Sequence, residues 1–157
     1  TGVQTCALPI YNAILYQSED KKNFTKKDFK VVSKRKPNKS QFDNLIFCFN
    51  VCRFVKSNAI VLVSDKSTVG IGSGQPSRLD SCQIAIDKMN KFNNNKGEII
   101  AASDAFFPFL DGVEKLVQSG ISAIIQPQGS INDKEVIKFA NRTNTILIFS
   151  KTRHFNH

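Results

Sequence analysis

The 157-residue chain has no tryptophan, one methionine, two histidines and four cysteines. It also lacks any apolar run near the roughly 20 residues that a membrane-spanning helix needs, so no membrane partner is expected. No basic segment followed by an apolar one stands at its start, and a secretory signal is therefore not expected either. Four scattered cysteines make no disulfide framework. Together these absences predict a protein of the reducing cytoplasm.

The side chains that metal-dependent or hydrolytic chemistry requires are also scarce. Cys48 and Cys52 are four residues apart, about one helical turn, but both histidines, at 154 and 157, stand far from them. A zinc site needs further ligands close by, so no metal is expected and the cysteines are predicted to be buried thiols. No Ser–His–Asp set and no close pair of carboxylates stands out, so nothing predicts a hydrolase.

The net charge of +9 is unevenly distributed. Residues 1–57 carry 11 Lys and Arg against 4 Asp and Glu, whereas residues 58–157 carry 11 against 9, and most of the excess falls in 21–39. Such a run either binds an anionic partner such as nucleic acid or is a solvated connection. Phe24 and Phe29 are not spaced like a base-stacking platform. Nucleic acid is therefore not favoured, and residues 11–40 are interpreted as a basic connecting segment.

Residues 1–10, TGVQTCALPI, resemble translated sequencing-adapter sequence, and we expect them to be a non-native leader. The rest alternates between two patterns from residue 41 to residue 157, which we interpret as one domain or a piece of a larger one. Apolar runs typical of strands buried on both faces lie at 59–63, 98–102, 121–125 and 145–149. Helical patterns lie at 41–56, 77–90, 111–119 and 133–141.

Smaller signals complete the predicted fold. Residues 29–32 form a possible edge strand, and 68–71 can pair back on the first buried strand as a hairpin. Ser40 is the predicted N-cap of the first helix, and Gly120 is placed to end the third. The apolar stripe of the first helix is predicted to contain Phe42, Leu45, Ile46, Phe49 and Cys52. The fold class is α/β, a three-layer sandwich with a mostly parallel mixed sheet.

Two dense loops, within 57–78 and 103–113, adjoin predicted strands, where α/β proteins build small-molecule sites. The segment Gly70–Gln75 is no dinucleotide fingerprint, because Gln75 stands where the third Gly is required, and no Lys follows Gly74 as a P-loop requires. It either forms a structural turn or presents N–H groups to an anion.

Several residues of these loops have two interpretations. Asn58 either caps a helix or holds a substrate amide, and Arg78 either binds phosphate or carboxylate or forms a surface ion pair. The run Phe106–Phe109, flanked by Asp104 and Asp111, lines a pocket or packs in the core. Arg153 belongs to a tail that is either docked or mobile.

Six ordered segments carry a resemblance to a known family: KVVSKRKP, VKSNAIVLV, TVGIGSGQPSR, SDAFFPFLDGVEKL, GISAIIQPQGS and RHFNH. From about Phe29 to His157 the chain resembles the C-terminal part of bifunctional purine-biosynthesis enzymes that join 5-aminoimidazole-4-carboxamide ribonucleotide (AICAR) formyltransferase to IMP cyclohydrolase. The resemblance implies a partial cytidine-deaminase-like fold without zinc. It also implies formyl transfer from 10-formyltetrahydrofolate to the AICAR amine, in a homodimer with sites between subunits.

The same resemblance implies roles for individual residues. Asn58 matches the catalytic asparagine, and Arg153 matches the arginine that binds the nucleotide phosphate. The expected lining of the substrate and folate pocket is Arg78, Phe106, Pro108, Asp111 and Ser130.

The chain also departs from the family pattern. Leu110 stands where the family usually has Arg, Gln128 replaces a usual Gly and Ser73 a usual Ala, while Pro76 precedes Ser77 where a longer side chain is common. A Lys-His segment of the type Phe-Lys-His-Val-Ser-Pro and the cyclohydrolase domain are not in these residues. We therefore expect these residues alone to be inactive or nearly so. The alternative is a non-catalytic α/β module that binds nucleotide or folate.

Overall fold

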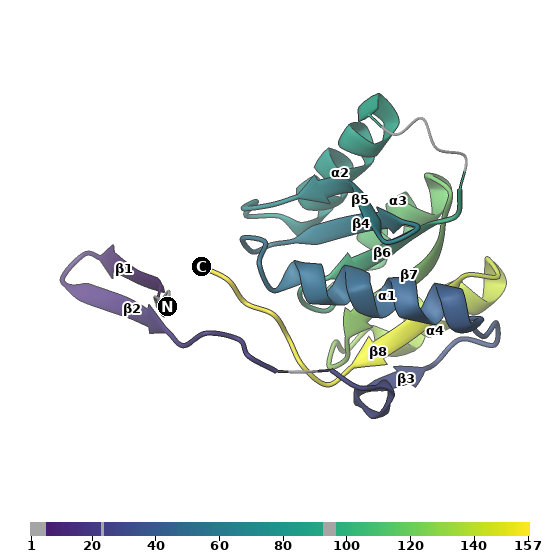
Figure 1. Cartoon of the computed structure of the whole chain (residues 1–157), viewed down its shortest axis with the longest axis horizontal. Helices are drawn as coiled ribbons and strands as arrows, with labels where there is room; N and C mark the ends of the chain where they lie inside the picture. The colour runs from purple at the N-terminus through teal and green to yellow at the C-terminus, as the bar shows by residue number, and fades with distance from the viewer. Residues whose placement is uncertain (1–5, 23, 93–96) are drawn as a thin grey trace.

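The computed structural model describes residues 6–22, 24–92 and 97–157, and its main body is one sheet between helices (Figure 1). The six strands of this sheet are β3 (Phe29–Val31), β4 (Ile60–Ser64), β5 (Ser67–Gly72), β6 (Ile99–Ser103), β7 (Ile121–Pro127) and β8 (Ile146–Ser150). The helices are the short 3₁₀ helix η1 (Lys26–Asp28), then α1 (Lys39–Cys52), α2 (Arg78–Phe92), α3 (Asp111–Gln118) and α4 (Asp133–Arg142).

The strand order is β3-β8-β7-β6-β4-β5. Strands β6, β7 and β8 pair in parallel, β4 is antiparallel to both β6 and β5, and β3 is antiparallel to β8. Strands β5 to β8 therefore run in one direction. The predicted mixed sheet, edge strand and hairpin are confirmed, and the sheet is partly parallel, with two parallel and three antiparallel pairings. We call the edge where β5 to β8 end and β4 begins the carboxyl edge.

The sheet is covered on both faces, as the continuous apolar strands predict. Alternate residues of β4 point to opposite sides: Val61 and Val63 join the core with α1, and Ile60 and Leu62 join the core with α2, α3 and α4. All four are fully buried. The three-layer sandwich is thus confirmed, with one helix on one face and three on the other (Figure 1).

Helix α1 differs in detail from its prediction. Its N-cap is Asn38 and not Ser40, because the Asn38 side chain accepts from the Gln41 N–H while the Gln41 side chain accepts from the Asn38 N–H. It ends at Cys52, four residues early, since the chain must turn back to begin β4. Ile46 was also wrongly placed in the buried stripe: Cys48 is buried there instead.

Before the body lies a separate hairpin of β1 (Cys6–Ile10) and β2 (Ala13–Gln17), which stands away from the sheet (Figure 1). Tyr11, Ile14 and Tyr16 are exposed on it. Residues 1–5 of the expected leader lie outside the described residues.

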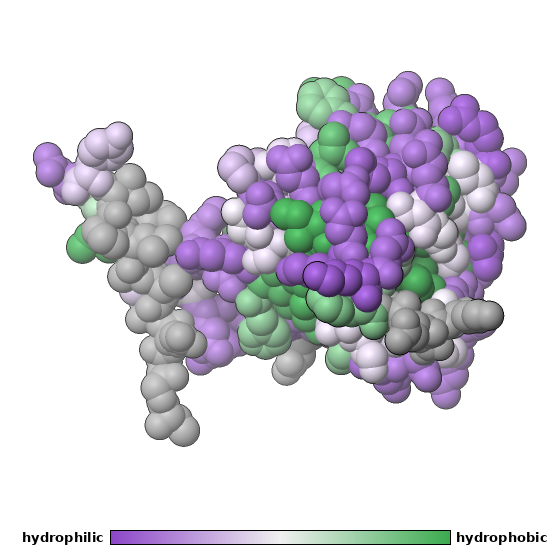
Figure 2. Space-filling view, turned by 90° about the horizontal axis from the view of Figure 1, so that it is seen from above, coloured by the Kyte–Doolittle hydropathy of each residue, from purple (hydrophilic) through white to green (hydrophobic). Residues whose placement is uncertain are grey.

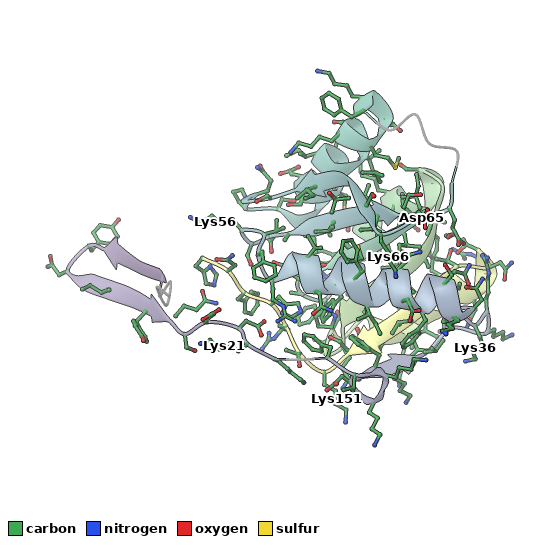
Figure 3. The ribbon with its side chains drawn as sticks, in the orientation of Figure 1. Lys21, Lys36, Lys56, Asp65, Lys66 and Lys151 are labelled. Carbon is green, nitrogen blue, oxygen red and sulfur yellow. The ribbon has the colours of Figure 1, made fainter. Side chains whose placement is uncertain are left out.

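The lysines of the basic segment and of the tail are spread over the surface. Lys21, Lys36 and Lys151 lie well apart (Figure 3), so these lysines of the basic segment and the tail do not converge on one point. Seen from above, the molecule is mainly hydrophilic, with smaller apolar patches between the polar side chains (Figure 2). Within the described ranges, no helix combines the length and the apolar character that crossing a membrane requires.

Candidate functional site

Strands β4 and β6 are neighbours at the centre of the carboxyl edge, where the strand order reverses. Asn58 precedes β4 and Asp104 follows β6, and the Asp104 N–H donates to the Ala59 carbonyl at 3.2 Å. The segment before β4 comes from α1, on one face, and the segment after β6 leads to α3, on the other. Ligands of α/β proteins bind at such reversal points.

Arg78, the first residue of α2, ties three predicted site segments together. Its Nη2 donates to Asn58 Oδ1 at 2.7 Å and to Asp104 Oδ1 at 3.0 Å, and its Nη1 donates to the Phe106 carbonyl at 3.2 Å. The Arg78 side chain is 11% exposed and that of Asp104 is fully buried. Arg78 is therefore a buried organising cation and not part of a surface ion pair.

Asn58 is held by backbone on both sides and does not cap α1. Its Nδ2 donates to the carbonyls of Gln75 and Pro76, both at 3.0 Å, and its own carbonyl accepts from Ser81 Oγ at 2.8 Å. Both amide hydrogens are thus in use. Because an amide oxygen has two lone pairs and Arg78 uses one, Oδ1 remains available as an acceptor.

The glycine-rich segment completes β5 and then turns the chain toward α2. A Cβ on Gly70 would lie 2.1 Å from the Ala85 carbonyl oxygen and one on Gly72 would lie 1.9 Å from that of Ser81, so both glycines allow α2 to approach β5. Gly74 has φ +68°, which favours glycine, and its N–H donates to the Lys56 carbonyl at 2.8 Å.

The phenylalanine loop divides between core and surface. Phe107 is buried against Gly112, where a Cβ would lie 2.7 Å from its ring. Phe106 is half-buried near Gly129, and Phe109 is 66% exposed. The core interpretation thus holds for Phe107, and the pocket interpretation of the rest of the loop stays a prediction.

The remaining predicted pocket residues lie on loops of the same edge or, in the case of Asp111, at the start of α3. Ser130 Oγ accepts from the Asn132 N–H at 3.1 Å, and Asn132 Nδ2 donates to the Pro108 carbonyl at 2.6 Å, which joins the loop after β7 to the loop after β6. Asp111 is exposed, and its Oδ1 accepts from the Gly112 N–H.

The tail after β8 is docked and not free. The Ser57 N–H donates to the Asn156 carbonyl at 2.9 Å and the His154 N–H donates to the Asp104 carbonyl at 2.8 Å. Arg153, the residue before the His154 anchor, is exposed, and its guanidinium carbon lies 5.3 Å from the centre of the Phe155 ring. The structure therefore brings all seven predicted site residues to one edge of the sheet.

Buried polar atoms single out the same edge. In the described part of the chain, six residues have buried side-chain nitrogen or oxygen atoms without a hydrogen-bond partner: Arg53, Arg78, Asp104, Gln126, Asp133 and His154. All six lie at or beside the carboxyl edge. Such atoms are few in native proteins, and each calls for an explanation. Sequence reasoning missed Gln126, although a glutamine within the apolar run of β7 was a detectable signal.

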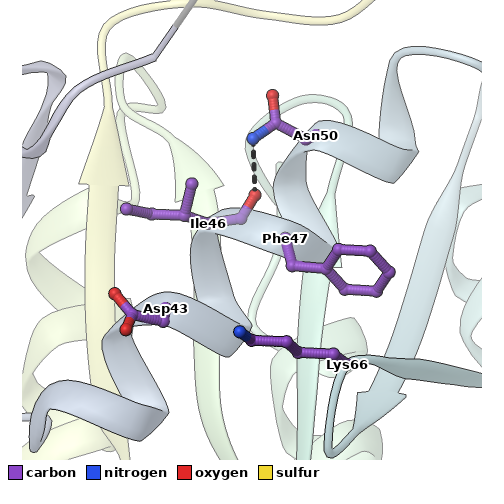
Figure 4. A pocket seen from close by; sticks show the side chains of 5 residues that line it. All are labelled: Asp43, Ile46, Phe47, Asn50 and Lys66. Carbon is purple, nitrogen blue, oxygen red and sulfur yellow. Dashed lines mark hydrogen bonds between the residues drawn. The ribbon is translucent and has the colours of Figure 1, made fainter.

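A shallow pocket of about 290 Å³ lies elsewhere, on the outer surface of α1 (Figure 4). Asp43, Ile46, Phe47 and Asn50 line it from the helix, and Lys66 lines it from the turn between β4 and β5. It contains none of the predicted site residues. The polar groups gathered at the carboxyl edge of this α/β sandwich make that edge, and not this pocket, the candidate functional site.

Comparison with known proteins identifies the family of the chain. The sequence model described as AICARFT/IMPCHase bienzyme matches residues 4–88. The chain is 47% identical over 148 residues to the bifunctional purine biosynthesis protein PurH of Buchnera aphidicola subsp. Acyrthosiphon pisum (strain Tuc7), covering 94% of this chain and 28% of that protein. PurH of Chlorobium chlorochromatii (strain CaD3) is 43% identical over 144 residues, again covering 28% of that protein. The chain belongs to the AICARFT/IMPCHase bienzyme family, and it spans 28% of the length of these relatives.

Proposed function

We propose that this chain forms the substrate-binding part of an AICAR formyltransferase of purine biosynthesis. The observation that carries the proposal is the gathering of buried, unpartnered polar atoms at the edge that also holds Asn58, Arg78 and Arg153. The family membership and the bifunctional relatives support the same reaction.

Each part of the edge fits one part of the substrates. Asn58 Oδ1 accepts from the AICAR carboxamide and holds it beside the reacting amine, and Arg153 binds the nucleotide phosphate through its charge. Half-buried Phe106 and exposed Pro108 fit the flat ring of 10-formyltetrahydrofolate, which supplies the formyl group. Ser130 and exposed Asp111 supply polar contacts to the same ring. Leu110 packs against the core beside α2 to α4 and offers no charge there.

The proposed protein acts as a homodimer. Phe109 is 66% exposed and Ile131 fully exposed, on loops that the Asn132–Pro108 hydrogen bond joins. Such side chains fit a second copy better than water. The general base belongs to the Lys-His segment that these residues do not contain. Since general acid–base help is worth about 10²–10⁴-fold, these residues alone are expected to show little or no transfer.

The test is formyl transfer by a full-length protein that contains these residues. Asn58→Ala is expected to lower kcat by about 100-fold, which is typical when a preorganised polar group at the reacting centre is lost. Asn90→Ala, on an exposed position of α2, is the matched control and keeps full activity. Unchanged kcat in Asn58→Ala overturns the proposal. Tight binding of AICAR or folate by the full-length protein without any turnover would favour the non-catalytic module.

A further inference from the structure

His154 is a buried histidine next to the exposed Arg153. Its ring centre lies 4.3 Å from that of Phe49 and 5.2 Å from that of Phe24, which it meets edge-on. Its Nδ1 lies 2.5 Å from Asp20 Oδ2. Asp20 and His154 are thus joined across almost the whole length of the chain, and neither belongs to a helix or a strand.

The tail is held from two sides at this point. From the sheet, the Asp104 carbonyl accepts from the His154 N–H, while the Asp104 carboxylate accepts from Arg78. From the N-terminal segment, Lys22 Nζ donates to Thr152 Oγ1 at 2.8 Å, and the Gln17 side chain bonds the backbone of Phe155. Figure 1 shows this segment and the tail running close to one another.

The tail alternates between buried and exposed side chains. His154 is buried, whereas Arg153 and Phe155 on either side are exposed. In an extended chain successive side chains point to opposite sides, so the direction in which His154 is fixed also fixes the direction of Arg153. The Phe155 ring beside the Arg153 guanidinium restricts that side chain further.

We propose that the Asp20–His154 pair is a positioning device that holds Arg153 at the carboxyl edge to receive the phosphate of the nucleotide substrate. The proposal rests on the proposed function and deepens it. An arginine on a free tail loses its freedom only when the ligand binds, and that loss weakens binding. A tail that is already fixed before the ligand binds does not lose this conformational freedom on binding.

The chemistry of the pair suits a fixed structural contact. Burial lowers the pKa of His154, and the hydrogen bond to Asp20 opposes this only in part. The ring is therefore neutral near pH 7, and its Nδ1–H donates to the Asp20 carboxylate. A phenylalanine could fill the same space between Phe24 and Phe49, but it could not bond to Asp20.

The test measures formyl transfer by a full-length protein that contains these residues, with AICAR and with its phosphate-free nucleoside as substrates. For Asp20→Ala and His154→Phe the expected result is a rise of about 10-fold in KM for the nucleotide, the size of one lost charge-assisted hydrogen bond, with kcat nearly unchanged. KM for the nucleoside should not change. Asp20→Asn keeps an acceptor oxygen and should recover most of the loss, while Glu19→Gln, a neighbouring exposed carboxylate, is the matched control.

Arg153→Ala separates the possible outcomes. If Arg153→Ala leaves KM for the nucleotide unchanged, the phosphate role in the proposed function fails. If it raises KM but Asp20→Ala does not, the positioning proposal is overturned. It is also overturned if Asp20→Ala raises KM for nucleotide and nucleoside equally, or raises it further in an Arg153→Ala background, because either result indicates a general structural role. A low yield of folded Asp20→Ala does not prevent the test, since His154→Phe is judged by the same criteria.

Discussion

The two edges of the sheet share one core yet are built in different ways. At the edge opposite the carboxyl edge, the chain turns tightly at Asp65–Lys66, Gly120 and Asn144, all with positive φ. Its ion pair, Arg35 with Glu98, spans 3.8 Å and is 36% and 40% exposed. At the carboxyl edge longer loops enclose a buried pair, Arg78 with Asp104. One edge closes the fold with local turns, and the other encloses a buried ion pair.

This difference has an energetic meaning. Burying charge is costly unless it is paired and hydrogen-bonded, and the buried ion pair Arg78–Asp104 places that cost at the carboxyl edge. None of the buried polar atoms without a partner, in the ranges that the structure describes, belongs to the opposite edge. Proteins depart from complete polar satisfaction mainly where function requires it, so the comparison supports the carboxyl edge as the candidate site.

The largest expected effect comes from breaking the two ion pairs in turn. Arg78→Met leaves the Asp104 carboxylate buried without its cation, which should cost about 3–5 kcal/mol. Arg35→Ala breaks an exposed pair and should cost about 1 kcal/mol or less. Hydrogen exchange of the β4 and β6 amides in the full-length protein measures both costs. Equal protection in the two variants would remove the distinction between the edges.

The next effect concerns one glycine from each edge. Gly72→Ala forces a Cβ against the Ser81 carbonyl of α2 and should cost about 3 kcal/mol, as overpacking does. Gly120 has φ +89° and open space around it, so Gly120→Ala adds only backbone strain of about 1 kcal/mol. Gly120→Asn should cost less still, because Asn tolerates this conformation. Thermal unfolding of the three variants gives the order, and a Gly72→Ala protein as stable as Gly120→Asn would contradict it.

Most of the fold followed from the hydrophobic periodicity. Strands such as β4 and β7 are apolar on both faces, so the sheet must be covered by helices on both sides. The end of α1 and its cap did not follow. Asn38 and Ser40 are both good N-caps, and only the reciprocal bond with Gln41 decides between them. Likewise, local pattern could not tell Phe107 in the core from Phe109 in solvent, since the close approach of Gly112 makes that choice.

The candidate site residues were chosen from the loops and the resemblance, and the contacts among these residues did not follow from the sequence. That Arg78 would join Asn58 to Asp104 depends on β4 and β6 being neighbours, which is a property of topology. The Asp20–His154 contact is harder still to predict from the sequence, because nearly the whole chain separates the two residues. Polar residues whose partners are distant in sequence leave no periodic signal.

A smaller effect is expected from pH. The pKa of His154 is lowered by burial, so the unfolded chain takes up the proton first as pH falls below the usual value of 6.5. Stability contributed by the docked tail is therefore present above pH 6.5 and is lost as pH decreases below it. The facing charges of Asp20, Arg53 and Asp104 set its extent. Hydrogen exchange of the tail amides between pH 5 and 7 checks this, and His154→Phe should lose the dependence. A wild-type tail whose protection is the same at both pH values would contradict the prediction.

The smallest expected effect is on thiol labelling beneath the two helical layers. Burial raises the pKa of Cys82 to about 12 and raises that of Cys48 as well, so neither is a reactive thiolate at pH 8. Both should react with a thiol reagent only when the protein opens.

The two thiols lie at different places in the fold. Cys82 Sγ lies under the loop of the carboxyl edge, where a Cβ on Gly112 would be 3.6 Å away from it. Cys48 is buried within α1. If that edge is the more readily opened one, Cys82 is labelled several-fold faster than Cys48 under native conditions, as mass spectrometry of the labelled peptides can measure. Equal rates would mean that both thiols wait for the same global unfolding, and that the difference between the edges is one of chemistry and not of local stability.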